Sequence, residues 1–205
     1  MSGQDFVRAA RASDAAGLAR VQVACWRHGY AGIVPGEVLA GLTSTEAETR
    51  WRDRWAEAIT KPPTTRHHVL VAVTAASPGS PPAAGLPPAA DNAHATVPSR
   101  IVAGFASAGP AGDGDRWPGT DAELFELRVA PELTGHGHGS RLLNAVADTL
   151  AEDRFTSVSA WVLEADTAFR RFLESAGWAP DGARSELDMG TSRIPVVRLR
   201  TLLAS

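Results

Sequence analysis

One turn in the second half of the chain is rich in glycine and lies where a strand gives way to a helix. It reads Thr134-Gly135-His136-Gly137-His138-Gly139, after a strand-like run ending at Val129 and before an amphipathic pattern of Leu142, Leu143, Val146 and Leu150. The first N–H groups of a helix lack acceptors within it, and the helix dipole adds about half a positive charge there. Glycine lets a diphosphate approach the backbone without an intervening Cβ. The pattern therefore predicts an anion-binding site.

The glycine spacing disfavours the main competing interpretation, a dinucleotide-binding Rossmann unit. That fingerprint reads G-x-G-x-x-G in an early strand–helix–strand unit, with an acidic residue ~20 positions further on. Here the glycines come late in the chain, and the third follows one residue too soon.

Polar side chains in and beside the turn give weaker signals. His136 and His138 flank Gly137, but two histidines without a nearby cysteine are poor support for a metal site. We expect imidazoles that contact phosphate or are exposed, and no bound metal. Arg141, one turn into the helix, reaches either a phosphate or solvent.

Hydrophobic periodicity places the turn in a mixed α/β chain with the order β-α-α-β-β-β-α-β-α-β-β. Before the turn we expect strands over 6–11, 68–74, 100–106 and 124–129, and helices over about 14–28 and 44–59. After it we expect a helix, a strand over 157–163, a helix capped by Asp166 or Thr167, and strands over 185–189 and 195–202. Gly177 should end the last helix in a left-handed conformation.

Length and composition indicate one domain over residues 1–205, with a Pro/Ala-rich loop insertion at about 75–99. Loop closure costs little more as length grows, so we interpret this insertion as tolerated rather than functional. A formal charge of −3 gives no general reason for nucleic acid or an anionic membrane to bind. The single cysteine, Cys25, excludes an intrachain disulfide, and without a signal peptide or a long apolar run we expect a cytoplasmic protein.

Three blocks of residues together resemble the GNAT superfamily of acyl-CoA-dependent N-acetyltransferases. The first, residues 127–143, is similar to the family's acetyl-CoA motif, in which L-x-V-x-P precedes Q/R-x-x-G-x-G/A and a helix. The second, residues 161–178, resembles its strand, F-Y-E helix and G-F turn. The third, with Trp26-Arg27, Tyr30-x-Gly32 and Pro35, resembles the opening of many bacterial members.

The resemblance implies a fold and a cofactor site. We expect a mixed central sheet with a V-shaped splay between strands four and five, flanked by about four helices, with acetyl-CoA in the splay. The backbone of Leu127 and Val129 would pair with pantetheine, and the Val129 amide would polarise the thioester carbonyl. The remaining cofactor contacts would come from Thr134, Gly135, His136, Gly137, His138, Gly139, Ser140, Arg141 and Asp166. A homodimer is plausible by analogy with the family.

The resemblance also implies that the first two helices cover the end of the cleft where the acceptor amine binds. Four aromatic residues of the first helices and the segment between them either line its pocket or belong to the core: Trp26, Tyr30, Trp51 and Trp55. Glu126 and Glu123 are the candidate general bases, since an ammonium must lose a proton before it attacks. They lie an odd number of residues apart, so we expect them on opposite faces of the sheet. The alternative for each glutamate is a solvated or salt-bridged carboxylate at the strand edge, without a catalytic role.

Three positions depart from the family pattern. Thr134 replaces the usual Gln or Arg, and Asp166 replaces a frequent Asn. Leu173 stands where many members have the Tyr that protonates the departing thiolate, and Tyr30, the chain's only tyrosine, belongs to another region.

These observations lead us to expect acetyl transfer from acetyl-CoA to a primary amine of a small-molecule or peptide acceptor. The amine would attack directly in a ternary complex, because Cys25 is far in sequence from the thioester site. Leu173 and Asp166 keep an alternative open, a CoA-binding regulatory or sensor module with little turnover. A structural domain that retains the fold without binding CoA is the other alternative.

Overall fold

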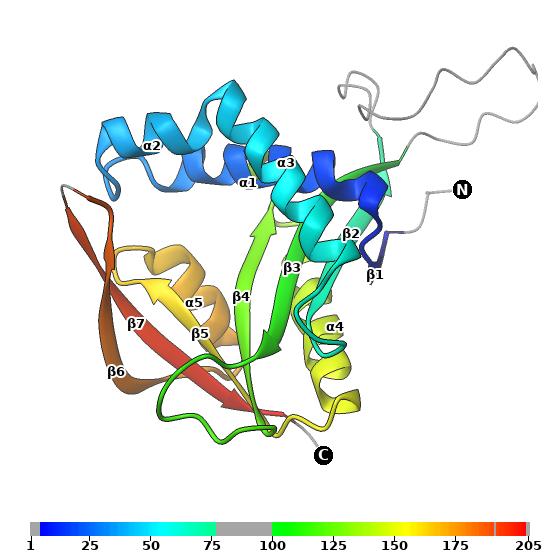
Figure 1. Cartoon of the computed structure of the whole chain (residues 1–205), viewed down its shortest axis with the longest axis vertical. Helices are drawn as coiled ribbons and strands as arrows, with labels where there is room; N and C mark the ends of the chain where they lie inside the picture. Colours follow the sequence, from blue (N-terminus) through cyan, green and yellow to red (C-terminus); the bar gives the residue numbers. More distant parts are fainter. Residues whose placement is uncertain (1–4, 77–99, 191, 204–205) are drawn as a thin grey trace, which may run out of the picture.

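A computed structural model describes residues 5–76, 100–190 and 192–203 of the chain. The predicted loop insertion at about 75–99 therefore lies, from residue 77 onward, outside the described residues. The rest forms a seven-stranded sheet in the order β1-β2-β3-β4-β5-β7-β6 (Figure 1). Its strands are β1 (Phe6–Ala9), β2 (His68–Ala75), β3 (Arg100–Pro110), β4 (Asp121–Val129), β5 (Ser157–Leu163), β6 (Ala179–Asp188) and β7 (Arg193–Leu202).

Five α-helices occur in the described parts of the chain. They are α1 (Ala15–Gly29), α2 (Gly36–Thr43), α3 (Thr45–Thr60), α4 (His138–Glu152) and α5 (Thr167–Ser175). Helix α2 was not predicted. It is short and contains two glycines, and its end is held from outside, because the Arg27 guanidinium of α1 donates to the Thr43 carbonyl. None of the described helices is long and apolar enough to cross a membrane.

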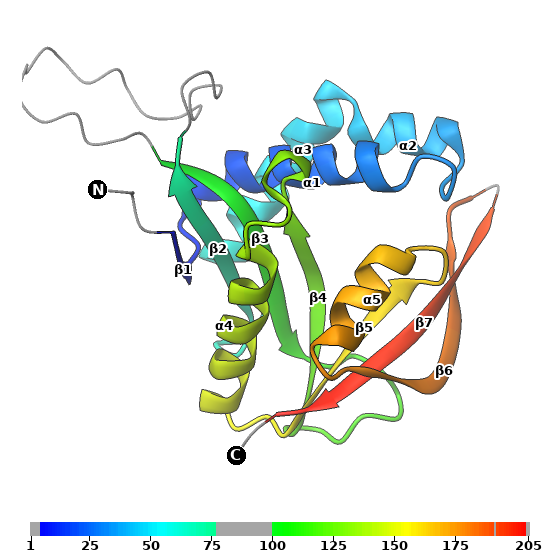
Figure 2. The same ribbon diagram turned by 180° about the vertical axis from the view of Figure 1, so that it is seen from behind.

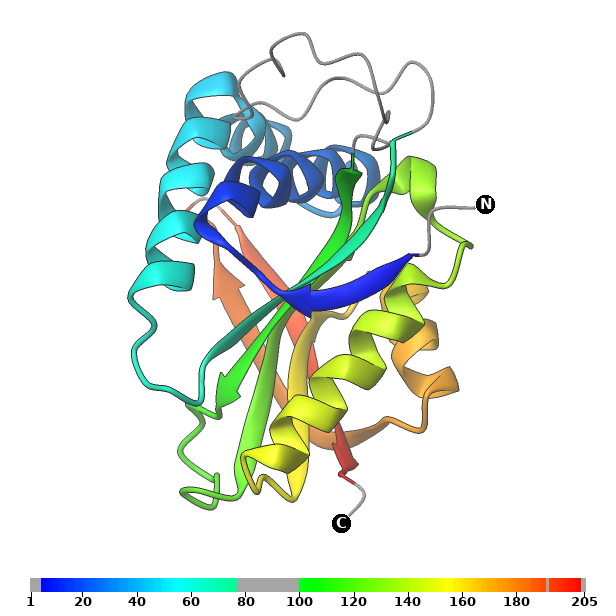
Figure 3. The ribbon, with the colours of Figure 1, turned by 90° about the vertical axis from the view of Figure 1, so that its right-hand side faces the viewer.

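The helices cover both faces of the sheet (Figure 3). Successive residues of β2 point to opposite faces: Leu70 and Ala72 belong to the buried cluster beneath α4, whereas Val71 and Val73 belong to the cluster beneath α1 and α3. The residues predicted to form the inner side of α4 are all buried, namely Leu142, Leu143, Val146 and Leu150.

Strands β4 and β5 pair over a short stretch and then separate. Their parallel register contains the pairs Asp121↔Ser157, Ala122↔Val158 and Glu123↔Ser159. Beyond these pairs β4 continues along β3 to Val129, and β5 continues along β7 to Leu163. The strands diverge toward the end where α1 lies, and Figure 2 shows α4 and α5 on either side of the opening. The predicted V-shaped splay is confirmed.

The closed end of the splay is held by charged side chains. Arg198 of β7 is 9% exposed and donates to Asp113 (2.8 Å), Asp115 (2.6 Å) and Asp181 (2.7 Å). Arg200 donates to the Asp121 carboxylate at 2.9 Å, which joins β7 to the start of β4. These contacts fix the vertex from which the two strands diverge.

A β-bulge in β4 changes which side chains share a face. Glu126 pairs with Ser107 and Leu124 with Ala108, which leaves Phe125 as an extra residue. Glu123 pairs with Gly109, two residues from Ser107 on β3. Glu123 and Glu126 therefore lie on the same face of the sheet, and the expectation of opposite faces is wrong, because the extra residue reverses the alternation.

Candidate active site

The turn into α4 has the backbone of an anion site. Gly135 and Gly137 have φ angles of 79° and 78°, in the left-handed region that favours glycine. Helix α4 begins at His138, and its first internal hydrogen bond runs from Arg141 N to the Gly137 carbonyl (3.1 Å). The N–H groups of the three residues before Arg141 consequently have no acceptor one turn back in the helix.

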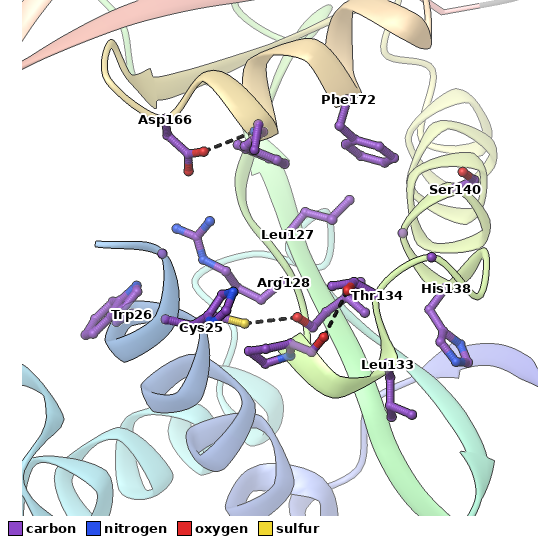
Figure 4. Close-up of a pocket in the computed structure, with 18 of the residues that line it drawn as sticks. Cys25, Trp26, Leu127, Arg128, Leu133, Thr134, His138, Ser140, Asp166 and Phe172 are labelled. Carbon is purple, nitrogen blue, oxygen red and sulfur yellow. Dashed lines mark hydrogen bonds between the residues drawn. The ribbon is translucent and has the colours of Figure 1, made fainter. Parts of the chain in front are cut away.

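This turn borders a cavity of about 510 Å³. Its walls come from β4, from the first residues of α4 and α5, and from the end of α1 (Figure 4). Eleven of the predicted site residues line it: Trp26, Tyr30, Leu127, Val129, Thr134, Gly135, Gly137, His138, Gly139, Ser140 and Asp166. The residues selected from the glycine motif thus meet residues from the first and last helices around one space.

His136 and Arg141 are not in the wall of this cavity. Arg141 Nη2 donates to Asp5 Oδ2 and to the His136 carbonyl, both at 3.0 Å, and lies 3.3 Å from His138 Nδ1. The His138 side chain is buried, and burial lowers its pKa despite the opposing charge of Asp5. His138 is therefore not an exposed imidazole. Its contribution to the anion site is its backbone N–H group at the start of α4, not a charged side chain. The expected exposure is met by His136.

Helix α5 forms the opposite wall. Asp166 caps it as predicted, accepting a hydrogen bond from Phe169 N at 3.0 Å. Phe169 and Phe172 stack with ring centroids 6.2 Å apart and both line the cavity. Gly177 ends this region with φ 86°, which confirms the predicted left-handed residue. Leu173 is fully buried in the core. Its side chain therefore offers the cavity no group that could protonate a departing thiolate.

Helix α4 approaches α5 closely at Gly139. A Cβ at this position would lie 3.3 Å from the Phe172 ring and 3.7 Å from a Val129 methyl group. Glycine here allows the helix start, β4 and α5 to converge while leaving the cavity open between them.

Cys25 lies in this cavity, although the sequence suggested that it was remote. Its thiol donates to the Val129 carbonyl at 3.1 Å, across 104 residues of sequence. Burial raises the pKa of Cys25 to about 11, against the opposing charge of Arg128. The group is therefore a neutral thiol near pH 7. Nothing in the local sequence signals this contact, because it depends on how α1 packs against the end of β4.

A second cavity of about 400 Å³ adjoins the first. The two share the wall residues Trp26, Tyr30, Leu127, Arg128 and Phe169. Trp51 also lines the second cavity, and its ring meets that of Trp26 edge-on, with centroids 5.0 Å apart. Trp55 instead belongs to the core, where its indole donates to Gln22 Oε1 at 2.7 Å.

Arg128 stands where the two cavities meet, and sequence reasoning missed it. Its Nη2 donates to Tyr30 Oη at 2.5 Å, and its Nε lies 3.0 Å from Glu126 Oε2. Figure 4 shows its side chain between Cys25 and Asp166. Burial alone would lower the pKa of Arg128, but Glu126 and Tyr30 raise it above its ordinary value, so the side chain is a permanent cation.

Tyr30 is positioned by the same contact. Burial raises its pKa to about 12 in spite of the neighbouring guanidinium, so the phenol is neutral near pH 7. Tyr30 is distant in sequence from the glycine turn and from Leu173. In space, however, it reaches the wall that the two cavities share.

The two candidate bases differ in what they face. Glu126 lines the second cavity, with a side chain 23% exposed. Glu123 lines neither cavity and accepts a long hydrogen bond from Gly112 N, at 3.4 Å. Burial raises the pKa of Glu123 above its ordinary value, with the Gly112 N–H opposing. Among the described residues, no group of three or more His, Cys, Asp or Glu side chains is arranged to hold a metal ion.

Comparison with known proteins agrees with this geometry. The model of the Acetyltransferase (GNAT) family matches residues 80–178. An uncharacterized N-acetyltransferase of Bacillus subtilis (strain 168), YuaI, is 28% identical over 158 residues, which cover 77% of this chain and 71% of that protein.

Solved structures share the fold. The PaiA N-acetyltransferase of Thermoplasma acidophilum, in complex with coenzyme A, has a TM-score of 0.62 and 15% identity, covering 95% of this chain and 98% of its own. YncA of Salmonella typhimurium, with its cofactor acetyl-CoA, has a TM-score of 0.60 and 16% identity, covering 98% and 95%. The splayed sheet, the glycine turn and the family model over residues 80–178 make the chain similar to the GNAT family of acetyltransferases.

Proposed function

We propose that this chain transfers the acetyl group of acetyl-CoA to a primary amine by direct attack within a ternary complex. One observation carries the proposal: a cavity lined by the free amides of α4 meets, at Arg128, a second cavity that contains the carboxylate of Glu126. The first cavity suits the cofactor, and the second suits the amine.

The cofactor would be bound mainly by backbone groups. The N–H groups of His138, Gly139 and Ser140 would hold the diphosphate, because a helix start attracts anions. Leu127 and Val129 border the cavity on a stretch of β4 that lies beyond its last pair with β5. Their outward-facing backbone groups would pair with the pantetheine arm. The solved relatives PaiA and YncA bind CoA and acetyl-CoA, which supports the same occupant here.

Val129 would polarise the thioester. The neighbouring Ala130 N–H bonds the Ala103 carbonyl of β3 at 2.8 Å. Because backbone groups alternate along a strand, the N–H and carbonyl of Val129 face the splay instead. The hydrogen bond from the Cys25 thiol to that carbonyl agrees with this orientation. The Val129 N–H would donate to the thioester oxygen as it gains negative charge.

Glu126 would take the proton that the amine must lose. The amine nitrogen would form a bond to the acetyl carbon, the carbon–sulfur bond would break, and CoA would leave as a thiolate that takes its proton from solvent. The carboxylate of Glu126, whose Oε2 lies 3.0 Å from Arg128 Nε, would also attract the incoming ammonium. Cys25 would take no part, since a thiol with a pKa of about 11 is a poor nucleophile near pH 7.

The proposal is tested by measuring CoA thiol release from acetyl-CoA with and without a panel of primary amines. We expect release above background that depends on an amine, and an acetylated amine in equal amount by mass spectrometry. Release that never depends on an amine, together with binding of acetyl-CoA, would instead indicate a CoA-binding protein without transferase activity.

A further inference from the structure

Resting on the proposed function, we infer that the acceptor is an arylalkylamine, a primary amine whose alkyl chain carries an aromatic ring. The second cavity is the basis of this inference. Its volume of about 400 Å³ lies within the range of small-ligand sites, roughly 300–1,000 Å³.

Aromatic rings dominate the wall of the second cavity. They include the chain's only tyrosine, three of its six tryptophans and two of its six phenylalanines, namely Tyr30, Trp26, Trp51, Trp161, Phe125 and Phe169. Aliphatic side chains complete the wall at its outer edge, where Leu187 and Met189 come from β6 and the turn after it. Such a wall stabilises a flat apolar group by area and by ring stacking.

The charged groups of the wall are few and lie together. Within the described part of the chain, Glu126 and Arg128 are the only charged residues in it, and Arg128 also borders the first cavity. The ammonium of an acceptor would therefore lie beside Glu126, close to the thioester, and its apolar body would extend toward Trp161 and Leu187. The aromatic faces would also favour the ammonium while it remains charged.

The same charge arrangement disfavours hydrophilic acceptors. A polyamine would bring a second ammonium into a wall whose one carboxylate, Glu126, is already paired with Arg128. A sugar would bring hydroxyl groups that find few partners among the rings. Burying polar groups without partners is costly, so both classes should bind poorly.

One buried donor in the wall lacks a partner. Trp26 is 8% exposed and borders both cavities, and its indole N–H has no hydrogen-bond acceptor among the described residues. A bound molecule with an acceptor atom would satisfy this group, which indicates that the junction of the cavities is shaped for an occupant.

The experiment compares kcat/KM for 2-phenylethylamine and tryptamine with that for 1,4-diaminobutane and glucosamine, at saturating acetyl-CoA. We expect the two arylalkylamines to be better by at least about tenfold, a ratio that small differences in apolar burial can produce. Leu187→Asp, at an exposed edge of the cavity, should lower kcat/KM for the arylalkylamines by about tenfold without changing the Kd of acetyl-CoA. Leu202→Asp is the matched control, because Leu202 is also exposed and lines neither cavity.

The outcomes separate this inference from the function on which it rests. Acetylation of 1,4-diaminobutane or glucosamine in preference to the arylalkylamines overturns the inference and leaves the transferase intact. An equal effect of Leu187→Asp and Leu202→Asp also overturns it. If acetyl-CoA binds and no amine of any class is acetylated, the proposed function fails, and the inference fails with it.

Discussion

Glu126 and Glu123 share a face of β4, and at the scale of single residues the question is which of them acts as the base. Glu126 borders the acceptor cavity and Glu123 does not. Glu126→Gln should therefore lower kcat by roughly a hundredfold or more, since it removes the proton acceptor, while the Kd of acetyl-CoA is unchanged. Glu123→Gln is the matched control, and we expect it to keep kcat within about threefold. A larger loss in Glu123→Gln than in Glu126→Gln would reverse the assignment.

Glu123 has a separate consequence for stability. Burial raises its pKa above the ordinary 4.5, so the folded chain binds this proton more tightly than the unfolded chain. The contribution of Glu123 to the free energy of unfolding therefore falls as the pH rises from the pKa of Glu123 in the unfolded chain through its higher pKa in the folded chain. The Tm of Glu123→Gln minus the Tm of the wild type should increase between about pH 4 and about pH 7. Thermal denaturation of both proteins across this range checks the sign, and a decrease would contradict it.

Cys25 distinguishes direct transfer from an acyl-enzyme. With a pKa of about 11, roughly one thiol in a thousand is ionised at pH 8. Cys25→Ala should keep kcat within about threefold, because the amine attacks acetyl-CoA itself. Steady-state kinetics with mass spectrometry of the intact protein provide the measurement. Acetylation of Cys25 in the wild type, with loss of turnover in the variant, would contradict direct attack.

Residues that were missed in the sequence share a physical reason. Cys25 touches Val129, and Tyr30 touches Arg128, across about a hundred residues of chain. Such contacts follow from how α1 packs against β4, and no local pattern encodes them. The glycine turn could be predicted because its chemistry resides in adjacent backbone groups.

At the scale of elements, the start of α4 carries the cofactor site. A side chain at Gly139 would meet the Phe172 ring and Val129, and would close the gap between α4 and α5. Gly139→Val should therefore raise the Kd of acetyl-CoA by at least about tenfold, a loss of roughly 1.4 kcal/mol of binding free energy. Calorimetric titration measures it. Gly41→Ala is the control, since a Cβ at Gly41 in α2 meets nothing within 4 Å, and equal effects of the two would refute the role given to Gly139.

Most elements were predictable because their patterns are strong. The strand at 157–163 matches β5 to the residue, and α4 buries the expected face. The errors arose where tertiary contacts decide. Helix α2 depends on Arg27 from another helix, and the bulge at Phe125 depends on pairing with β3. That one extra residue places Glu126 on the same face as Glu123 instead of the opposite one.

At the scale of the whole molecule, the sheet combines a fixed vertex with an open end. Arg198 and its three aspartates hold the vertex, and the diverging strands create the two adjoining cavities. Arg128 and Tyr30 belong to the walls of both cavities, so a cofactor bound in the first cavity should order one wall of the second. We therefore expect acetyl-CoA to bind before the amine, which initial-rate kinetics with CoA as product inhibitor would check. An acceptor that binds with equal affinity in the absence of cofactor would contradict this order.

Recognition of the cofactor diphosphate by the start of α4 is the central claim, and thermal denaturation with two ligands tests it most directly. Acetyl-CoA at about a hundred times its Kd should raise the Tm by roughly 5–10 °C. Acetylpantetheine at the same concentration has the same thioester without the diphosphate, and it should raise the Tm far less. Equal shifts with the two ligands, or no shift with acetyl-CoA, would contradict the account.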